Sequence, residues 1–134
     1  MNSIERTTTV RELVPLLFVE NIGRSLTFYL DLGFELAGTW EPGGNLSWCR
    51  LQRDSSALML QQATDEDGPA KGRGRGIEFF FICDDADAFH SELRRKGMEL
   101  PSPQTAFYAM KQVFLRDPDG YKLCFESPVA TPNN

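Results

Sequence analysis

The chain has 134 residues, of which 41% are hydrophobic and 25% are charged, a composition typical of one globular domain with a substantial core. Its formal net charge of −5 argues against a nucleic-acid partner, because binding to phosphates depends on a basic surface. The apolar runs are too short for a membrane span and the N-terminus lacks the apolar segment of a signal peptide, so we expect a cytoplasmic protein with no membrane partner.

The first half of the chain predicts a strand, a helix and three further strands. Asn21 supplies an N-terminal cap for a short amphipathic helix, and Gly33 supplies the left-handed conformation that ends it. The turn sequences Pro42-Gly43-Gly44 and Asp54-Ser55 separate the strands that follow. The predicted strands are Leu13–Glu20, Phe34–Glu41, Asn45–Arg53 and Ser56–Gln62.

The second half repeats this pattern after a linker. Residues 64–76 have no apolar periodicity, which indicates a solvated connection. A strand over Ile77–Asp84 precedes a helix that is capped by Asp84 or Asp85 and ended by Gly97. The remaining predicted strands are Met98–Leu100, Tyr108–Arg116 and Tyr121–Ser127, with a loop over Pro101–Phe107 and a type I turn over Asp117-Pro118-Asp119-Gly120.

The two halves are related by an internal repeat. The segment from Val19 to Leu36 aligns without a gap with the segment from Cys83 to Leu100, and the same order of elements recurs in both halves. The sequence therefore predicts one α+β domain over residues 1–134, built from two βαβββ modules in tandem. We expect the first module over about residues 11–63 and the second over about residues 77–127.

Two motifs carry a resemblance to a known superfamily. The sequence VPLLFVENIGRSLTFYLDLGF, from Val14, resembles the opening strand, helix and glycine of a vicinal-oxygen-chelate module, and VFLRDPDGYKLCFES, from Val113, resembles its closing hairpin. The chain is thus similar to glyoxalases, extradiol dioxygenases and bleomycin-resistance proteins, with Val14-Pro15 and the acidity closest to the bleomycin-resistance branch. The resemblance implies a curled eight-stranded mixed sheet around a cleft, with the helices outside, commonly in a homodimer.

The metal-binding pattern of that superfamily is incomplete here. Its enzymes hold a divalent ion with His, Gln and Glu side chains on the first and last strand of each module. These positions map to Val14, Met59 (Leu60 or Gln61 in a shifted register), Glu78 and Cys124. Val14 and Met59 are not ligands for a hard cation, and the one histidine, His90, lies on the second helix, where a packed or half-exposed side chain is expected. We therefore expect no cofactor, with a divalent metal ion as the alternative.

The three cysteines, Cys49, Cys83 and Cys124, are separated by long intervals and include no CxxC pair. This spacing predicts reduced thiols packed in strands, rather than a disulfide framework or a zinc ribbon.

Strand alternation assigns side chains to a candidate ligand face. Leucines and phenylalanines at alternate positions suit packing beneath the helices, so the residues between them face the cleft. Trp48 shares its strand face with Arg50 and Gln52, so it is either a platform for a ligand ring or an ordinary core residue. The candidate ligand-binding residues are Trp48, Arg50, Met59, Gln61, Glu78, Tyr108, Cys124 and Glu126.

Glu78 stands in the otherwise apolar strand IEFFFI, where a carboxylate is paired, protonated or functional. One interpretation pairs it with Arg50, Lys111 or Arg116 on a neighbouring strand. Another places it in contact with a ligand, and it is also the one weak candidate for an acid–base catalytic residue.

These residues favour a metal-independent protein that sequesters a planar or cationic, drug-like small molecule in the cleft of a homodimer. The alternative is a metal-dependent lyase, isomerase or dioxygenase of the glyoxalase type with a degenerate or shifted metal site. A third hypothesis is a cofactor-free enzyme that works through Glu78.

Overall fold

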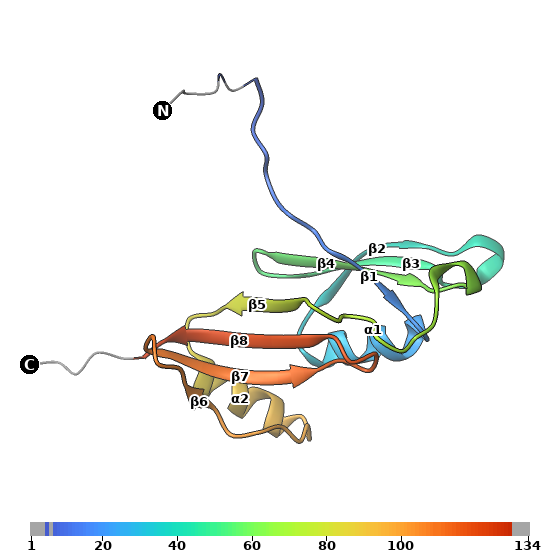
Figure 1. Ribbon diagram of the computed structural model, residues 1–134. Helices are drawn as coiled ribbons and strands as arrows, with labels where there is room; N and C mark the ends of the chain where they lie inside the picture. Colours follow the sequence, from blue (N-terminus) through green and yellow to red (C-terminus); the bar gives the residue numbers. More distant parts are fainter. Residues whose placement is uncertain (1–4, 6, 130–134) are drawn as a thin grey trace, which may run out of the picture.

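The computed structural model describes residue 5 and residues 7–129 (Figure 1). The first module contains β1 (Leu16–Val19), α1 (Ile22–Asp31), β2 (Glu35–Trp40), β3 (Trp48–Arg53) and β4 (Ser56–Gln62). The second contains β5 (Glu78–Ile82), α2 (Ala86–Arg95), β6 (Gln104–Thr105), β7 (Met110–Arg116) and β8 (Lys122–Pro128). Single 3-10 turns lie at Pro42–Gly44 and Asp65–Asp67. The expected α+β fold of two βαβββ units is confirmed.

The strands form two four-stranded mixed sheets with the same topology. The order is β1-β4-β3-β2 in the first sheet and β5-β8-β7-β6 in the second. The first strand of each module runs parallel to its last strand, and the other pairs are antiparallel. The repeat in the sequence is therefore also a repeat of the strand pairing.

The first strand is shorter than predicted. It begins at Leu16 rather than Leu13, because Pro15 has no N–H group to donate to a neighbouring strand. Pro15 contributes only its carbonyl oxygen, which accepts a hydrogen bond from the Met59 N–H at 2.8 Å. Val14 therefore precedes β1 instead of lying within it.

The predicted strand Met98–Leu100 is wrong, and the outer strand of the second sheet is β6. The segment before β6 instead follows α2 closely, because Nε2 of His90 lies 3.0 Å from the carbonyl oxygen of Pro101. His90 is buried in this contact, as a packed helix-face histidine should be. The two prolines of this segment, which carry no N–H group, leave room for pairing only after Pro103.

Both helices begin at the predicted cap residues. The Asn21 side chain accepts from the Arg24 N–H at 3.0 Å, and the Asp85 side chain accepts from the Ala88 N–H at 3.0 Å. Within the described residues, no helix is long and apolar enough to span a bilayer.

One face of each sheet packs against a helix, and these covered faces share a single core. Phe34, which precedes β2, lies edge to face with Phe81 of β5, with ring centroids 5.8 Å apart. Phe81 also stacks on Phe125 of β8, which stacks in turn on Phe89 of α2. The covered faces are thus turned toward the junction between the modules, and the opposite face of each sheet lies on the outside.

A buried hydrogen bond ties α1 to the second module. The Tyr29 hydroxyl donates to Oδ2 of Asp117, in the turn between β7 and β8, at 2.8 Å. Desolvation, followed by the charge of Asp117, raises the pKa of Tyr29, so the hydroxyl keeps its proton and remains a donor.

Candidate functional site

The outer face of each sheet has no helix on it, and we call these surfaces the open faces. The open face of the first sheet carries Leu16, Phe18, Trp48, Arg50, Met59 and Gln61. The open face of the second sheet carries Glu78, Phe80, Ile82, Gln112, Phe114, Arg116, Lys122, Cys124 and Glu126. The alternation is clear in β4, where Leu58 and Leu60 are buried in the core while Met59 and Gln61, which follow them in turn, are half-buried.

Trp48 is the first residue of β3, and its side chain lies on the first open face, with β2 on one side and β4 on the other. It is paired with Trp40 of β2 on one side and with Gln61 of β4 on the other. Its ring lies over Gly38, where an added Cβ would make ordinary van der Waals contact with ring carbons at 3.6 Å. Trp48 is half-buried, and Trp40 is largely exposed.

Arg50, beside Trp48 on the same face, is already paired. Its Nη2 lies 2.9 Å from Oε1 of Glu12, in the segment that precedes β1. The first open face therefore combines aromatic rings, an amide and an ion pair whose partner comes from outside the sheet.

On the second open face, Glu126 is bonded to two neighbours. Oε1 of Glu126 accepts from Nε2 of Gln112 at 2.9 Å and from the Tyr108 hydroxyl at 3.2 Å. Nε2 of Gln112 also donates to the Tyr108 oxygen at 2.6 Å. We call Tyr108, Gln112 and Glu126 the Glu126 cluster. Desolvation, with the Glu126 charge as the second cause, raises the pKa of Tyr108 and keeps its hydroxyl a donor.

Glu78 differs from its predicted surroundings. Its partner is Lys122, with Oε1 and Nζ 3.8 Å apart, so the predicted pairing with Arg50, Lys111 or Arg116 is wrong. The reason is register, because Lys122 is the residue directly opposite Glu78 on the parallel strand β8. The Glu78 side chain is 48% exposed, so it avoids the desolvation free energy of a carboxylate that is buried in apolar surroundings. Its catalytic role stays a prediction.

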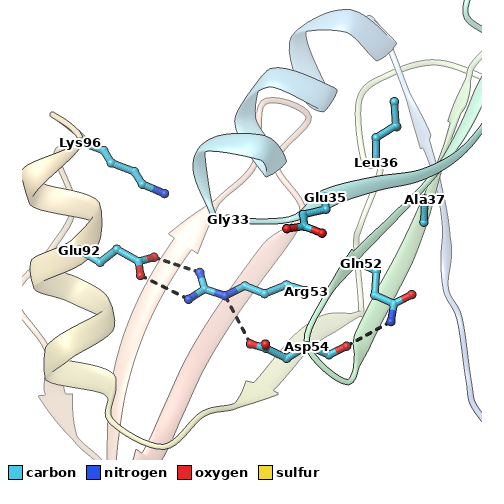
Figure 2. Close-up of a pocket in the computed structure, with 9 residues that line it drawn as sticks. All are labelled: Gly33, Glu35, Leu36, Ala37, Gln52, Arg53, Asp54, Glu92 and Lys96. Carbon is cyan, nitrogen blue, oxygen red and sulfur yellow. Dashed lines mark hydrogen bonds and ion pairs between the residues drawn. The ribbon is translucent and has the colours of Figure 1, made fainter.

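Figure 2 shows a hollow of about 600 Å³ at the junction between the modules, separate from the Glu126 cluster. Arg53, at the end of β3, points across it toward α2. Nη1 of Arg53 lies 3.0 Å from Oε2 of Glu92, and it also donates to the Leu32 carbonyl oxygen at the end of α1. Gly33 has a φ of 89°, a conformation that favours glycine, and an added Cβ would lie 2.6 Å from that same nitrogen, so the guanidinium would have to shift. The charged groups of Arg53 and Glu92 are paired with each other rather than free to bind a ligand, which favours a structural role for this hollow.

A second hollow, of about 610 Å³, adjoins the first across Arg53. Its apolar wall is the stack of Phe81, Phe125 and Phe89, and the Arg53 guanidinium lies 5.1 Å from the centre of the Phe89 ring. The chain thus supplies its own cation to this aromatic wall.

Comparison with known proteins identifies the family. A model of the Glyoxalase/Bleomycin resistance protein/Dioxygenase superfamily matches residues 8–125. The chain belongs to this superfamily. No curated protein matches its sequence significantly.

Solved structures of the superfamily share the fold at low sequence identity. A bleomycin-binding protein complexed with bleomycin is 17% identical, with a TM-score of 0.65 over 91% of this chain and 100% of that one. TnmS3, an antibiotic binding protein from Streptomyces sp. CB03234, is 19% identical, with a TM-score of 0.70 over 90% of this chain and 98% of that one. A lactoylglutathione lyase from Agrobacterium tumefaciens is 17% identical, with a TM-score of 0.63 over 90% and 96% of the two chains.

The residues at the superfamily's metal positions do not fit a divalent ion. Val14 and Met59 offer no suitable donor, and Glu78 is engaged by Lys122. Cys124 offers a buried, soft sulfur in place of a hard oxygen ligand. Among residues 7–129, no group of three or more His, Cys, Asp and Glu side chains is arranged to hold a metal.

The structure places the predicted candidate residues on or beside the two open faces and adds Gln112, which was not among them. The structure groups Trp48, Arg50, Met59 and Gln61 on the first open face, and Glu78, Cys124 and Glu126 on the second, with Tyr108 beside it. Gln112 is directly opposite Glu126 and is buried. The signal available was a lone amide in the strand MKQVFLR, two residues from Phe114 and therefore on the same face.

Proposed function

We propose that this member of the superfamily binds and sequesters a planar or cationic small molecule between two copies of the chain, without a metal ion. The observation that carries the proposal is the composition of the open faces. Aromatic and aliphatic side chains stand exposed beside a few placed polar groups, which is typical of small-molecule sites. The solved bleomycin complex and the antibiotic binding protein TnmS3 share the fold and support a ligand of this class.

A second copy is part of the proposal because the open faces of one chain lie on opposite sides of the shared core. Leu16 and Trp40 on the first sheet, and Phe80 and Ile82 on the second, leave apolar surface exposed. Symmetric association that brings the first open face of one copy over the second open face of another would cover this surface. It would also enclose a ligand between Trp48 and Glu126.

The charge of the chain supports a cation over an anion. The formal net charge is −5. The second open face carries two carboxylates and two cations, with Glu78 paired to Lys122, and Glu126 is the carboxylate on it without an ion-pair partner among the described residues. A negative surface raises the on-rate of a cation and makes it fall as salt rises. We also propose the cytoplasm as the site of action, in keeping with three cysteines that are all free in the structure.

Three measurements on the purified protein test the proposal. Light scattering at micromolar concentration should give twice the mass of the chain, and elemental analysis after dialysis should find no stoichiometric divalent ion. A bleomycin-like glycopeptide or a planar cation, at 100 times its dissociation constant, should raise the free energy of unfolding by about 2.7 kcal/mol. One equivalent of zinc, nickel, manganese or iron would instead favour the lyase or dioxygenase alternative. A monomer that no such ligand stabilises would refute the binding function.

A further inference from the structure

The hydrogen bonds of the Glu126 cluster leave it with acceptors only. The hydrogens of the Gln112 amide are directed to Glu126 Oε1 and to the Tyr108 oxygen, and the Tyr108 hydrogen is directed to Glu126 Oε1. The reverse amide orientation would place the Gln112 oxygen against a carboxylate oxygen, so the network itself sets the orientation of the amide. What remains is Oε2 of Glu126 and Oε1 of Gln112, and both are acceptors.

Both remaining oxygens belong to nearly buried residues. Gln112 and Glu126 are each only 7% exposed. Neither Oε2 of Glu126 nor Oε1 of Gln112 accepts a hydrogen bond from residues 7–129. A donor that reaches the two oxygens would therefore displace no hydrogen-bond donor of residues 7–129.

The surroundings keep the cluster in place, and the nearest cation of β8 on the same face is paired, while Arg116 lies four residues from Gln112 along β7. Tyr108 is held by the tight turn that precedes β7, in which the Ala109 N–H donates to the Ala106 carbonyl at 3.0 Å. Ala109 has a φ of 63°, a conformation that costs a residue with a Cβ about 1 kcal/mol and is therefore maintained by its surroundings. Lys122, on the same open face, is engaged by Glu78.

We infer that the Glu126 cluster selects organic cations that carry N–H donors, such as a primary ammonium, amidinium or guanidinium group. Such a group would donate one hydrogen to Oε2 of Glu126 and a second to Oε1 of Gln112. An anion would meet two acceptors, and a quaternary ammonium would bring charge but no donor. This inference deepens the proposed function and rests on it, because it names the chemistry that the second open face would recognise.

Three small aromatic probes separate charge from hydrogen bonding on the wild-type protein. Benzamidine is a planar cation with N–H donors, benzoate is an anion of nearly the same shape, and phenyltrimethylammonium is a cation without donors. NMR titration should show benzamidine binding at least about tenfold more tightly than either of the others, because hydrogen bonds to charged groups contribute about 1.5–3 kcal/mol. The largest amide shifts should fall at Tyr108, Gln112 and Glu126. Equal affinities for benzamidine and phenyltrimethylammonium would overturn the inference.

A substitution tests the carboxylate itself. Glu126→Gln should weaken benzamidine binding by about tenfold or more, while Glu99→Gln makes the same charge change on an exposed residue outside the cluster and should leave it within about twofold. Thermal unfolding of both variants checks that the fold is retained.

Titration with a bleomycin-like glycopeptide separates this inference from the proposed function. If the glycopeptide binds the wild-type protein and the Glu126→Gln variant equally, the function stands and the role of the cluster is wrong. If neither the glycopeptide nor benzamidine binds the wild-type protein, both are wrong.

Discussion

Replacing Arg53 with alanine should loosen the junction that holds the two modules together. Arg53 is the last residue of β3, yet it contacts α1 through the Leu32 carbonyl and α2 through Glu92 and the Phe89 ring. Because the relative position of the modules fixes the two open faces, this side chain connects the stability of the fold to the shape of the proposed dimer cleft.

The expected loss follows from the contacts of Arg53. The hydrogen bond to Leu32 contributes about 1 kcal/mol net. The ion pair with Glu92 contributes about 1 kcal/mol, because the two side chains are 28% and 33% exposed and solvent screens them. The guanidinium over Phe89 contributes about 0.5–1 kcal/mol. With some packing lost as well, Arg53→Ala should lower the free energy of unfolding by about 2–4 kcal/mol, and Tm by about 10 °C.

Urea unfolding followed by tryptophan fluorescence measures this loss, with two control variants. Arg53→Lys keeps the charge but not the fork of N–H groups, so it should recover only part of the stability. Arg116→Ala removes an exposed arginine of β7 and should change the free energy of unfolding by less than about 0.5 kcal/mol. A loss below about 1 kcal/mol for Arg53→Ala, or one no larger than that of Arg116→Ala, would refute the role assigned to the junction.

Three further predictions concern single side chains. Trp48→Ala should weaken binding of an aromatic ligand by about three- to thirtyfold. Because Trp48 is half-buried, the change should cost less stability than the roughly 3–5 kcal/mol lost on truncating a fully buried tryptophan. Unchanged affinity in a folded variant would remove Trp48 from the site. Desolvation raises the pKa of Cys83 and raises that of Cys124 to about 12, so at pH 8 iodoacetamide should label Cys83 slowly and leave the buried Cys124 unmodified in the intact mass, and rapid labelling of Cys124 would contradict the structure. Desolvation also raises the pKa of Asp117, so the contribution of this group to stability is present below about pH 4 and is lost as the pH rises through the folded-state value. The free energy of unfolding of Asp117→Asn, relative to wild type, should therefore rise with pH. A fall with pH would show that the sign is the opposite.

The order of the elements could be predicted from sequence because it depends on local signals. Caps, glycines and alternation act over a few residues, and Ser56–Gln62 was predicted with the bounds that β4 has in the structure. The strand β3 begins at Trp48 rather than at the predicted Asn45, and two failures occurred where proline removes a hydrogen-bond donor, before Leu16 and around Pro101. There the apolar composition of the segment was a poorer guide than its capacity to pair.

The contacts across the fold could not be predicted from sequence, because they depend on register and on how helices sit on sheets. To predict the ion-pair partner of Glu78, one would need the register of β5 against β8, which places Lys122 directly opposite it. Arg53 required the position of α2, which is contributed by the other module. Gln112 required the pairing of β7 with β8, which places it against Glu126.

The position of the polar groups on the second open face bears on the chemistry of the whole site. At the superfamily's metal position, β8 presents Cys124, a buried thiol with a soft sulfur in place of an oxygen ligand. The carboxylate of Glu126 stands two residues further along the same face, where it is bound by an amide and a phenol rather than directed toward a shared ion. A carboxylate fixed in this way has one oxygen that accepts no hydrogen bond from residues 7–129, and under the proposed function this oxygen would orient a ligand. On that proposal, the strand that supplies a metal ligand in a glyoxalase-type enzyme would here recognise an organic cation.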